Sequence, residues 1–384
     1  MSQCNLQEQT KSGLLKASVV TGALIVGMAQ AHAQSYSFIQ LDSLGGTYDT
    51  VFGVNNAGQV VGMSTTADST QAAVVWNGST PSILASPAGL SSSALAINDA
   101  GQSAGVAFDN TLGSSTYGTQ VAVVWNGATP TTLASLGGTS NAAAAINGSG
   151  QVAGYSSTSD NAAQEAVVWN GGTPTILSSL GGVSNAATGI NNAGQVAGYS
   201  TTDGNATQEA VVWNGTTPTI LSSLGGTSGV AAAINNAGQV VGFSSTSGNA
   251  TVEAVLWNGT TATVLDSLGG GYSAANAINN AGQIVGSSSA GGFGASSAVL
   301  WNGTSVTDLN TFLTPEAVTA GWQLYAATGI NDAGMIVGFD VNLSTGQAGA
   351  FALVPVPEPQ VYAWMLAGFA ALGLTARRRT ALGR

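Results

Sequence analysis

The sequence has almost no positive charge. Lys and Arg together make up six of its 384 residues, and there is one His and one Cys. All of these lie near the two ends, so the stretch from residue 34 to residue 357 contains no Lys, Arg, His or Cys. All but two of the seventeen acidic residues, Glu8 and Glu358, lie in that stretch, which is therefore acidic throughout.

These absences exclude several functions for the body of the chain. Nucleic-acid binding needs cations against phosphate, and a Ser–His–Asp or Cys–His centre needs histidine. Thiolate and imidazole metal sites are excluded in the same way, which leaves oxygen ligands for a hard cation such as Ca²⁺. One cysteine cannot form an intramolecular disulfide. We therefore expect no nucleic-acid partner and no cofactor other than calcium.

Glycine and small apolar residues are abundant instead. The chain has 54 Gly, and 44% of its residues are hydrophobic, which is too many for a disordered acidic chain. The apolar residues are mostly Ala and Val in short runs, a pattern that favours a β-rich fold with many turns.

The first 33 residues have the pattern of a secretory signal peptide. Lys11 and Lys16 form a basic region, residues 17–28 are apolar, and Ala31 and Ala33 supply an A-x-A cleavage pattern. The alternative is an N-terminal core helix. We expect export across the inner membrane.

The other end combines three features in order: a Pro-Glu-Pro motif, an apolar segment over residues 361–376 and a basic cluster. Sixteen residues is close to the roughly 17 needed to span a bilayer, and a basic cluster is typical of a cytoplasmic stop. The residues concerned are Pro357, Glu358, Pro359, Arg377, Arg378 and Arg379. This tail resembles the PEP-CTERM sorting signal. The resemblance implies transient anchoring in the inner membrane, cleavage by an exosortase, and a final place at the cell surface or in an exopolysaccharide matrix of a biofilm or floc. A plain C-terminal anchor is the alternative.

A ten-residue pattern recurs seven times in the middle of the chain. The copies are 53–62 GVNNAGQVVG, 96–105 AINDAGQSAG, 145–154 AINGSGQVAG, 189–198 GINNAGQVAG, 233–242 AINNAGQVVG, 277–286 AINNAGQIVG and 329–338 GINDAGMIVG. Their matching glycines are separated by 43, 49, 44, 44, 44 and 52 residues. A period near 44 is typical of propeller blades or helix-pair solenoids, and the Gly, Asn, Thr and Ser content disfavours helices.

One copy shows the expected elements. Residues 184–191, 195–200, 209–214 and 217–224 have the composition of strands, and Asn-Ala-Gly (192–194) predicts a tight turn between the first two. Asn214-Gly215 predicts a type I′ hairpin turn between the last two. Four short antiparallel strands per repeat is the anatomy of a propeller blade.

The ends of the repeat region favour a closed ring. Six repeats contain a W-N-G strand, whereas the seventh ends at 350–353 AFAL with no fourth strand after it. The unmatched fourth strand is at the start, where 35–46 SYSFIQLDSLGG resembles TPTILSSLGG. We therefore predict an all-β, seven-bladed β-propeller over residues 34–354, closed by its N-terminal strand, between a signal peptide (1–33) and a sorting tail (355–384). A β-solenoid is the alternative.

The repeat resembles the HAF family of bacterial extracellular repeats. The resemblance rests on the I-N-x-x-G-Q-V-x-G core and the A-V-V-W strand that follows, and it covers most of residues 35–354. Six repeats have Ala-Val where that family has His-Ala-Phe. The resemblance implies an extracellular location rather than a particular chemistry.

Several recurring residues have both a functional and a structural interpretation. The repeated asparagines could form a ring of ligands, but Asn in such turns usually bonds its own backbone: Asn55, Asn98, Asn147, Asn191, Asn235, Asn279 and Asn331. The matching glycines indicate positive φ or close approach. The six W-N-G tryptophans could stack on sugars, yet their fixed place in a strand favours packing between blades. The same holds for Tyr155, Tyr199 and Phe243.

Acidic residues cluster near the loops that join the second and third strands. Their carboxylates, on one face of the ring, are candidate calcium ligands: Asp160, Glu165, Asp203, Glu209 and Glu253. No D-x-D-x-D-G loop is present, so the favoured interpretation is a solvated acidic face that keeps the protein soluble.

We expect an exported, non-catalytic binding or structural module associated with exopolysaccharide. One alternative is a glycoside hydrolase that uses two carboxylates. The other is a structural coat protein without a ligand.

Overall fold

The computed structural model describes residues 35–111, 113–291 and 296–356, and these residues fold mainly into β-strands. No helix within these ranges is long and apolar enough to cross a membrane. The predicted signal peptide (1–33) and the apolar segment 361–376 of the sorting tail lie outside the described residues.

The strands group in fours, and we call each group a blade. The first four blades are β2 (Gly45–Val54), β3 (Gln59–Thr66), β4 (Gln71–Asn77) and β5 (Thr80–Ile83); β6 (Ser91–Ile97), β7 (Gln102–Phe108), β8 (Gln120–Asn126) and β9 (Thr129–Thr132); β10 (Gly137–Ile146), β11 (Val152–Thr158), β12 (Gln164–Asn170) and β13 (Thr173–Ile176); and β14 (Gly181–Ile190), β15 (Val196–Thr202), β16 (Gln208–Asn214) and β17 (Thr217–Ile220).

The remaining blades are β18 (Gly225–Ile234), β19 (Gln239–Thr246), β20 (Val252–Asn258) and β21 (Thr261–Val264); β22 (Ser273–Ile278), β23 (Ile284–Ser289), β24 (Ser296–Asn302) and β25 (Ser305–Asp308); and β26 (Trp322–Ile330), β27 (Ile336–Asn342) and β28 (Gln347–Pro355) with β1 (Tyr36–Gln40). The helical elements are the 3₁₀ turns η1 (Pro87–Gly89), η2 (Asp203–Asn205), η3 (Ser247–Asn249) and η4 (Leu309–Phe312), and the helix α1 (Pro315–Thr319).

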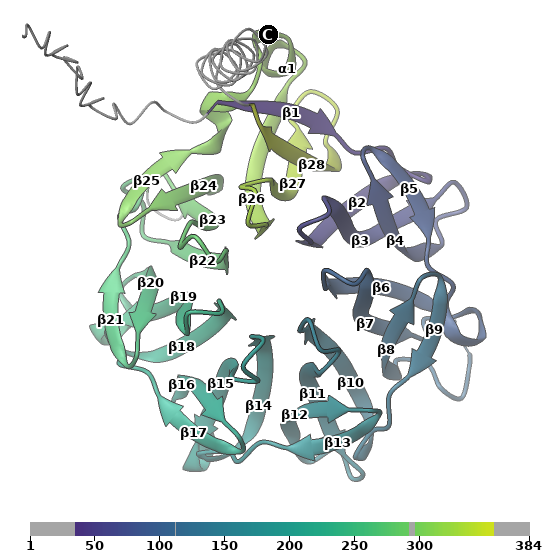
Figure 1. The fold of residues 1–384 in the computed structure, drawn as a ribbon, viewed down its shortest axis with the longest axis vertical. Coiled ribbons are helices and arrows are strands. Elements are labelled where there is room, and N and C mark those ends of the chain that lie inside the picture. Colours follow the sequence, from purple (N-terminus) through teal and green to yellow (C-terminus); the bar gives the residue numbers. More distant parts are fainter. Residues whose placement is uncertain (1–34, 112, 292–295, 357–384) are drawn as a thin grey trace, which may run out of the picture. The chain divides into compact units, whose positions relative to one another are not determined.

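The blades stand around a central axis, with the first strand of each innermost (Figure 1). Neighbouring strands within a blade are antiparallel, and single parallel pairs, such as Gln164 with Ser184, link the third, fourth and fifth blades into one sheet. This arrangement is a β-propeller, which confirms the predicted all-β fold. The β-solenoid alternative is wrong, because the last blade takes a strand from the start of the chain.

That strand is β1, which closes the ring. It pairs antiparallel with β28, from Tyr36 opposite Pro355 to Gln40 opposite Phe351. The strand order of the seventh blade is therefore β1-β28-β27-β26. We call the contact between the seventh and first blades, together with β1, the seam.

The hydrophobic core is divided among the contacts between neighbouring blades. The W-N-G tryptophans are at most 1% exposed, and each donates from Nε1 to a main-chain carbonyl before its blade, as Trp213 does to Ser178 at 2.9 Å. Their predicted packing role is confirmed, because no face is free to stack on a sugar. Tyr155, Tyr199 and Phe243 are half-buried.

A glycine in each second strand permits the close approach of the first strand. A Cβ on Gly198 would lie 2.1 Å from the carbonyl oxygen of Ala186, and the β14–β15 ladder has a bulge between Ala187 and Gly189. The same glycine recurs at the end of every G-Q-V-x-G motif. Any side chain there would push the innermost strand away from its neighbour.

The hairpin turn after Asn214 differs from the predicted type I′. Asn214 pairs with Thr217, so the central residues of the turn are Gly215 and Thr216. Only Gly215 has positive φ (+66°), as a type II′ turn requires, whereas type I′ needs positive φ at both positions. Asn214 is the last residue of β16 and lies outside the central pair.

Two buried carboxylates lie at the seam. Asp49 is 4% exposed and pairs across the ladder with Ser64, as Asn185 pairs with Ser200 in the fourth blade. Asp340 is fully buried, and its Oδ1 accepts a hydrogen bond from Gln40 Nε2 on β1 at 3.4 Å. Asp49 Oδ1, Asp340 Oδ2 and Gln40 Oε1 have no partner within the described part of the chain.

Burial raises the pKa of both carboxyls. For Asp340 it raises the pKa to about 7, although the hydrogen bond from Gln40 opposes the shift. For Asp49 burial also raises the pKa, and the hydrogen bond from Ser64 opposes it. The sequence offers no cation to either group, because Lys, Arg and His are absent from residues 34–357.

Candidate functional site at the axial mouth

The turn between the first and second strands of each blade lies beside the central axis, at one end of the channel. In the fourth blade Asn191 Oδ1 accepts hydrogen bonds from the main-chain N–H groups of Ala193 and Gln195, at 3.1 and 3.0 Å. The turn needs positive φ at Gly194 (+78°). These bonds confirm the predicted role of the repeated Asn and Gly in the turn.

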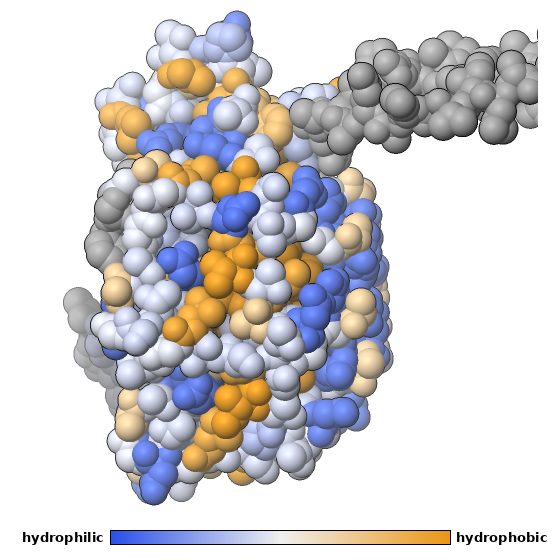
Figure 2. All heavy atoms as spheres, turned by 90° about the vertical axis from the view of Figure 1, so that its left-hand side faces the viewer, coloured by the Kyte–Doolittle hydropathy of each residue, from blue (hydrophilic) through white to orange (hydrophobic). Residues whose placement is uncertain are grey.

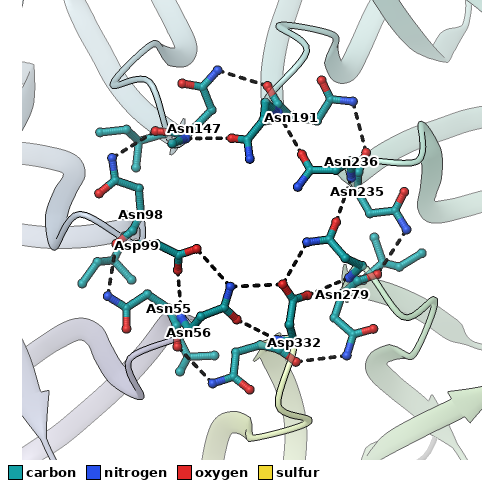
Figure 3. A pocket seen from close by; sticks show the side chains of 18 of the residues that line it. Asn55, Asn56, Asn98, Asp99, Asn147, Asn191, Asn235, Asn236, Asn279 and Asp332 are labelled. Atoms are coloured by element: carbon teal, nitrogen blue, oxygen red, sulfur yellow. Dashed lines mark hydrogen bonds between the residues drawn. The ribbon is translucent and has the colours of Figure 1, made fainter.

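The same asparagine also binds the next blade. Asn191 Nδ2 donates to Gln195 Oε1 at 2.9 Å and to the main-chain carbonyl of Asn235 at 3.1 Å. The inter-blade bond repeats around the whole ring, ending with Asn331 Nδ2 to the carbonyl of Asn55 at 3.0 Å (Figure 3). We call these residues the asparagine belt: Asn55, Asn98, Asn147, Asn191, Asn235, Asn279 and Asn331.

The belt has little hydrogen-bonding capacity left for a ligand. A primary amide has two N–H donors and two lone pairs on its oxygen. Six of the belt side chains use all four in the way described for Asn191, and only Asn331 differs, because Met335 replaces the glutamine beside it. The belt is therefore a wall of the mouth and not a set of ligands.

The residues that follow the belt asparagines form an exposed polar ring, which we call the rim: Asn56, Asp99, Gly148, Asn192, Asn236, Asn280 and Asp332. Main-chain N–H groups of the rim donate to the side-chain oxygen of the next blade, as Asn192 does to Asn236 at 2.9 Å. This pattern is interrupted only at Gly148, which has no side-chain oxygen to offer. The Nδ2 groups of Asn192 and Asn236 bond to no other described residue.

Two rim residues carry carboxylates, and both accept a hydrogen bond from the side-chain amide of Asn56. Asn56 Nδ2 donates to Asp99 Oδ2 at 3.0 Å and to Asp332 Oδ2 at 3.1 Å. Burial raises the pKa of Asp332, but hydrogen bonds from Asn280 and Asn56 outweigh it and hold that pKa below its usual range. Asp332 is therefore ionised at neutral pH, and one side of the rim is negatively charged.

The residues that precede the belt asparagines form a ring of aliphatic side chains, which we call the floor: Val54, Ile97, Ile146, Ile190, Ile234, Ile278 and Ile330. The floor separates two cavities on the axis. The outer one, between rim and floor, has a volume of about 200 Å³. The inner one, of about 210 Å³, is lined by the first strands from Phe52 to Gly329.

The loop acids predicted as calcium ligands do not meet at this mouth. The loops between second and third strands leave the opposite ends of those strands, so they lie on the other face of the ring. Asp160 is exposed there and accepts hydrogen bonds from Thr158 Oγ1 at 2.6 Å and from Ala162 N at 3.1 Å, which lower its pKa. Asp203 is exposed in η2.

The three predicted glutamates share one position, the second residue of the third strand. Glu165 accepts a hydrogen bond from Asn185 Nδ2 at 3.3 Å, and burial raises its pKa. Glu253 accepts one from Ser273 Oγ at 3.5 Å, and Glu209 holds the same place in β16. Across the described ranges, no three acidic, His or Cys side chains form a group that could hold a metal ion.

The residues predicted for sorting and processing all lie outside the described residues. They are Ala31, Ala33, Pro357, Glu358, Pro359, Arg377, Arg378 and Arg379.

Comparison with known proteins supports the fold. No protein-family model and no curated protein matches the chain. Among solved structures, the β-propeller domain of the Trilobed protease from Pyrococcus furiosus, described as having an open velcro topology, has a TM-score of 0.52 at 8% identity over 81% of this chain and 98% of that one. TolB from Acinetobacter baumannii has a TM-score of 0.43 at 11% identity and covers 65% of this chain and 61% of that one. A mutant Aleuria aurantia lectin has a TM-score of 0.37 at 15% identity and covers 68% of this chain and 94% of that one. The first match is similar enough to support the propeller fold; it carries no information on activity.

Proposed function

We propose that the protein is an exported, non-catalytic module of the cell surface or extracellular matrix. It is a closed, seven-bladed propeller between two sorting signals, and it binds glycan at its axial mouth. The observation that carries this proposal is the outer cavity, of about 200 Å³, whose polar rim is fixed in place by hydrogen bonds from blade to blade.

The chemistry of the rim suits hydroxyl groups. The carboxylates of Asp99 and Asp332 accept hydrogen bonds from sugar hydroxyls, and the free Nδ2 groups of Asn192 and Asn236 donate to them. Because these groups are already held by their neighbours, little conformational entropy is lost when a ligand binds. The mouth is favoured over the opposite loop face, because the loop acids do not converge on a cavity.

The alternative of glycoside hydrolysis needs one carboxylic acid that stays protonated and a second that is ionised. At the mouth, the hydrogen bonds of Asp332 lower its pKa, which removes it as a proton donor. The carboxyl with a pKa raised to about 7, Asp340, is buried at the seam and has no access to the mouth. We therefore favour binding without catalysis.

The sorting part of the proposal comes from the tail. The resemblance to PEP-CTERM signals implies an exosortase partner, transient anchoring in the inner membrane, and an association with exopolysaccharide. Mass spectrometry of the protein recovered from the cell surface tests this step. A C-terminus close to Pro357–Pro359 supports exosortase cleavage, and an intact tail ending at Arg384 contradicts it.

Co-sedimentation with the host's own exopolysaccharide tests the binding function. We expect saturable binding by the protein, reduced at least about tenfold in affinity by Asp332→Asn, because a charge-assisted hydrogen bond at the rim is lost. Asp160→Asn, on the opposite face, is the matched control and should bind as the unchanged protein does. Absence of binding contradicts the glycan proposal and favours a coat protein. Release of reducing sugar that is abolished by Asp99→Asn or Asp332→Asn would favour the hydrolase.

A further inference from the structure

The mouth has two chemically different levels, a polar rim and an apolar floor. We propose that it selects a sugar residue bearing a methyl group, with the ring hydroxyls at the rim and the methyl group against the floor. This inference rests on the proposed glycan-binding function and adds the chemical class of the ligand. Figure 3 shows the mouth from close by, with the belt and rim side chains around it.

The size of the outer cavity limits the ligand to a small group. A volume of about 200 Å³ is below the roughly 300–1,000 Å³ of pockets that hold a drug-sized ligand. Such a space suits one sugar ring, with the rest of a chain leaving through the open rim. The ligand must therefore present a terminal residue or a single exposed ring.

The floor gives no polar partner to that ring. It consists of seven Val and Ile side chains, and those of Ile234 and Ile278 are half-buried, so part of their surface faces the axis. Covering this surface with a methyl group removes apolar area from water on both partners, which is favourable. A hydroxyl in the same place would lose its bonds to water.

The belt cannot compensate for such a hydroxyl. Each belt asparagine follows a floor residue in the sequence, and both sets of side chains line the outer cavity. Six of the belt amides already use both donors and both lone pairs, so a hydroxyl lowered past the rim finds a free amide group only at Asn331. Leaving a buried polar group unpaired is more costly than leaving a methyl group there. The two levels together therefore discriminate between a methyl-bearing sugar and its hydroxylated counterpart.

Isothermal titration of the full chain with matched sugars tests this selectivity. Suitable pairs are L-rhamnose and L-mannose, 3-O-methylglucose and glucose, and N-acetylglucosamine and glucose. In these pairs the methyl group comes from a deoxy carbon, an ether and an acetamido group, respectively. We expect the methyl-bearing member of at least one pair to bind about tenfold or more tightly. Equal affinities within every pair overturn the inference and leave the glycan function standing. No binding of any sugar, together with no binding of the exopolysaccharide, removes both.

Variants of the floor assign the selectivity to it. The double change Ile234→Thr and Ile278→Thr places hydroxyls on the floor, and we expect it to reduce the preference for the methyl-bearing sugar to less than about threefold. Ile220→Thr is the matched control, since Ile220 is 49% exposed on the outer wall of the fourth blade. A preference that survives the double change overturns the role of the floor. If the double variant unfolds at the assay temperature, the matched pairs on the unchanged protein decide the question.

Discussion

Replacing Asp49 with Asn is predicted to stabilise the protein. Asp49 occupies the position that Asn185 holds in the fourth blade. There the amide Nδ2 of Asn185 donates to the main-chain carbonyls of Gln164, in the preceding blade, and Gly182, at 3.3 and 3.1 Å. Asp49 has no N–H to offer, and its Oδ1 is buried without a described partner. The substitution supplies the missing donor.

The magnitude follows from these contacts. Two gained hydrogen bonds contribute about 1 kcal/mol each, and removal of a buried unsatisfied carboxylate oxygen contributes about 1–3 kcal/mol more. Allowing for imperfect geometry, we expect Asp49→Asn to raise the free energy of unfolding by about 2–3 kcal/mol at pH 7.5. For a domain of this size that corresponds to an increase in Tm of about 3–4 °C.

The effect should depend on pH in a defined direction. Burial raises the pKa of Asp49 in the folded protein, so its carboxyl stabilises the fold when protonated, and that stability is lost as the pH rises through the folded pKa. The Asn variant has no such titration. The difference in Tm between the two proteins should therefore be largest at neutral pH and shrink toward pH 4.

Differential scanning calorimetry of both proteins between pH 4 and pH 8 measures these differences. Asn185→Asp is the reverse control: it removes the same donors and places a carboxylate beside Glu165, whose Oε2 lies 3.3 Å from Asn185 Nδ2. We expect it to cost at least about 2 kcal/mol at pH 7.5. A folded Asp49→Asn protein with unchanged or lower Tm at pH 7.5 would refute the reasoning.

Three further predictions concern the seam, the belt and the blade contacts. Asp340→Asn should raise Tm at pH 8 but not at pH 4, which thermal unfolding at both pH values checks. The buried Asp340 carboxyl has its pKa raised to about 7, so the free energy of unfolding of the unchanged protein falls by up to about 4 kcal/mol as the pH rises from 4 through 7. Asn191→Ala should cost about 2–4 kcal/mol in denaturant unfolding, since four hydrogen bonds are lost, whereas the exposed Asn192→Ala should cost under about 1 kcal/mol. Trp213→Phe should lower stability by about 1–3 kcal/mol, because it leaves the Ser178 carbonyl without its donor and opens a cavity; an unchanged unfolding midpoint would contradict the role assigned to that bond.

Much of the fold follows from the sequence, because each repeat contains its own local signals. The Asn and Gly of each first turn are recognisable from the chemistry of turns, and the buried Trp from its fixed place in a strand. The closing strand could be predicted as well, since SYSFIQLDSLGG has no other unit to complete.

The errors arise where the structure depends on neighbours. The sequence predicts the fourth strand over residues 217–224, but β17 ends at Ile220. Leu221 still donates to Ala210 of its own blade, whereas Ser222 donates to Thr260 of the next blade. The turn type depends on which residues face each other, and the register places Asn214 outside the central pair.

The candidate site was largely hidden from sequence reasoning. The asparagine belt joins Asn331 to Asn55 across 276 positions, a contact that no local pattern encodes. The rim follows the belt by one residue, and its Asn and Asp residues look like ordinary turn residues in the sequence. Conversely, the loop acids recur in the sequence at similar positions, yet their separation on different blades keeps them from forming a group.

Apolar side chains also gather in separate patches on the outer wall, between polar areas (Figure 2). Exposed aliphatic residues occur at the ends of several outermost strands, such as Ile176 at 49% and Val264 at 44% exposure. These strands are only four residues long, and several contain proline, as β13 and β17 do. Short, proline-containing edges limit strand addition from other chains.

The position of β28 determines how the protein responds to mechanical load. Val356 donates to the Ser35 carbonyl, so the two ends of the propeller leave it side by side. Tension applied between these two ends peels β1 from β28 one residue pair at a time. When tension is applied at Val356 and the rest of the propeller is held, the force instead acts on β28. This strand is hydrogen-bonded to β1 on one edge and to β27 on the other, so many bonds must shear at once. A propeller held by its C-terminal end is thus mechanically strong, and the same propeller pulled by both ends opens at the seam.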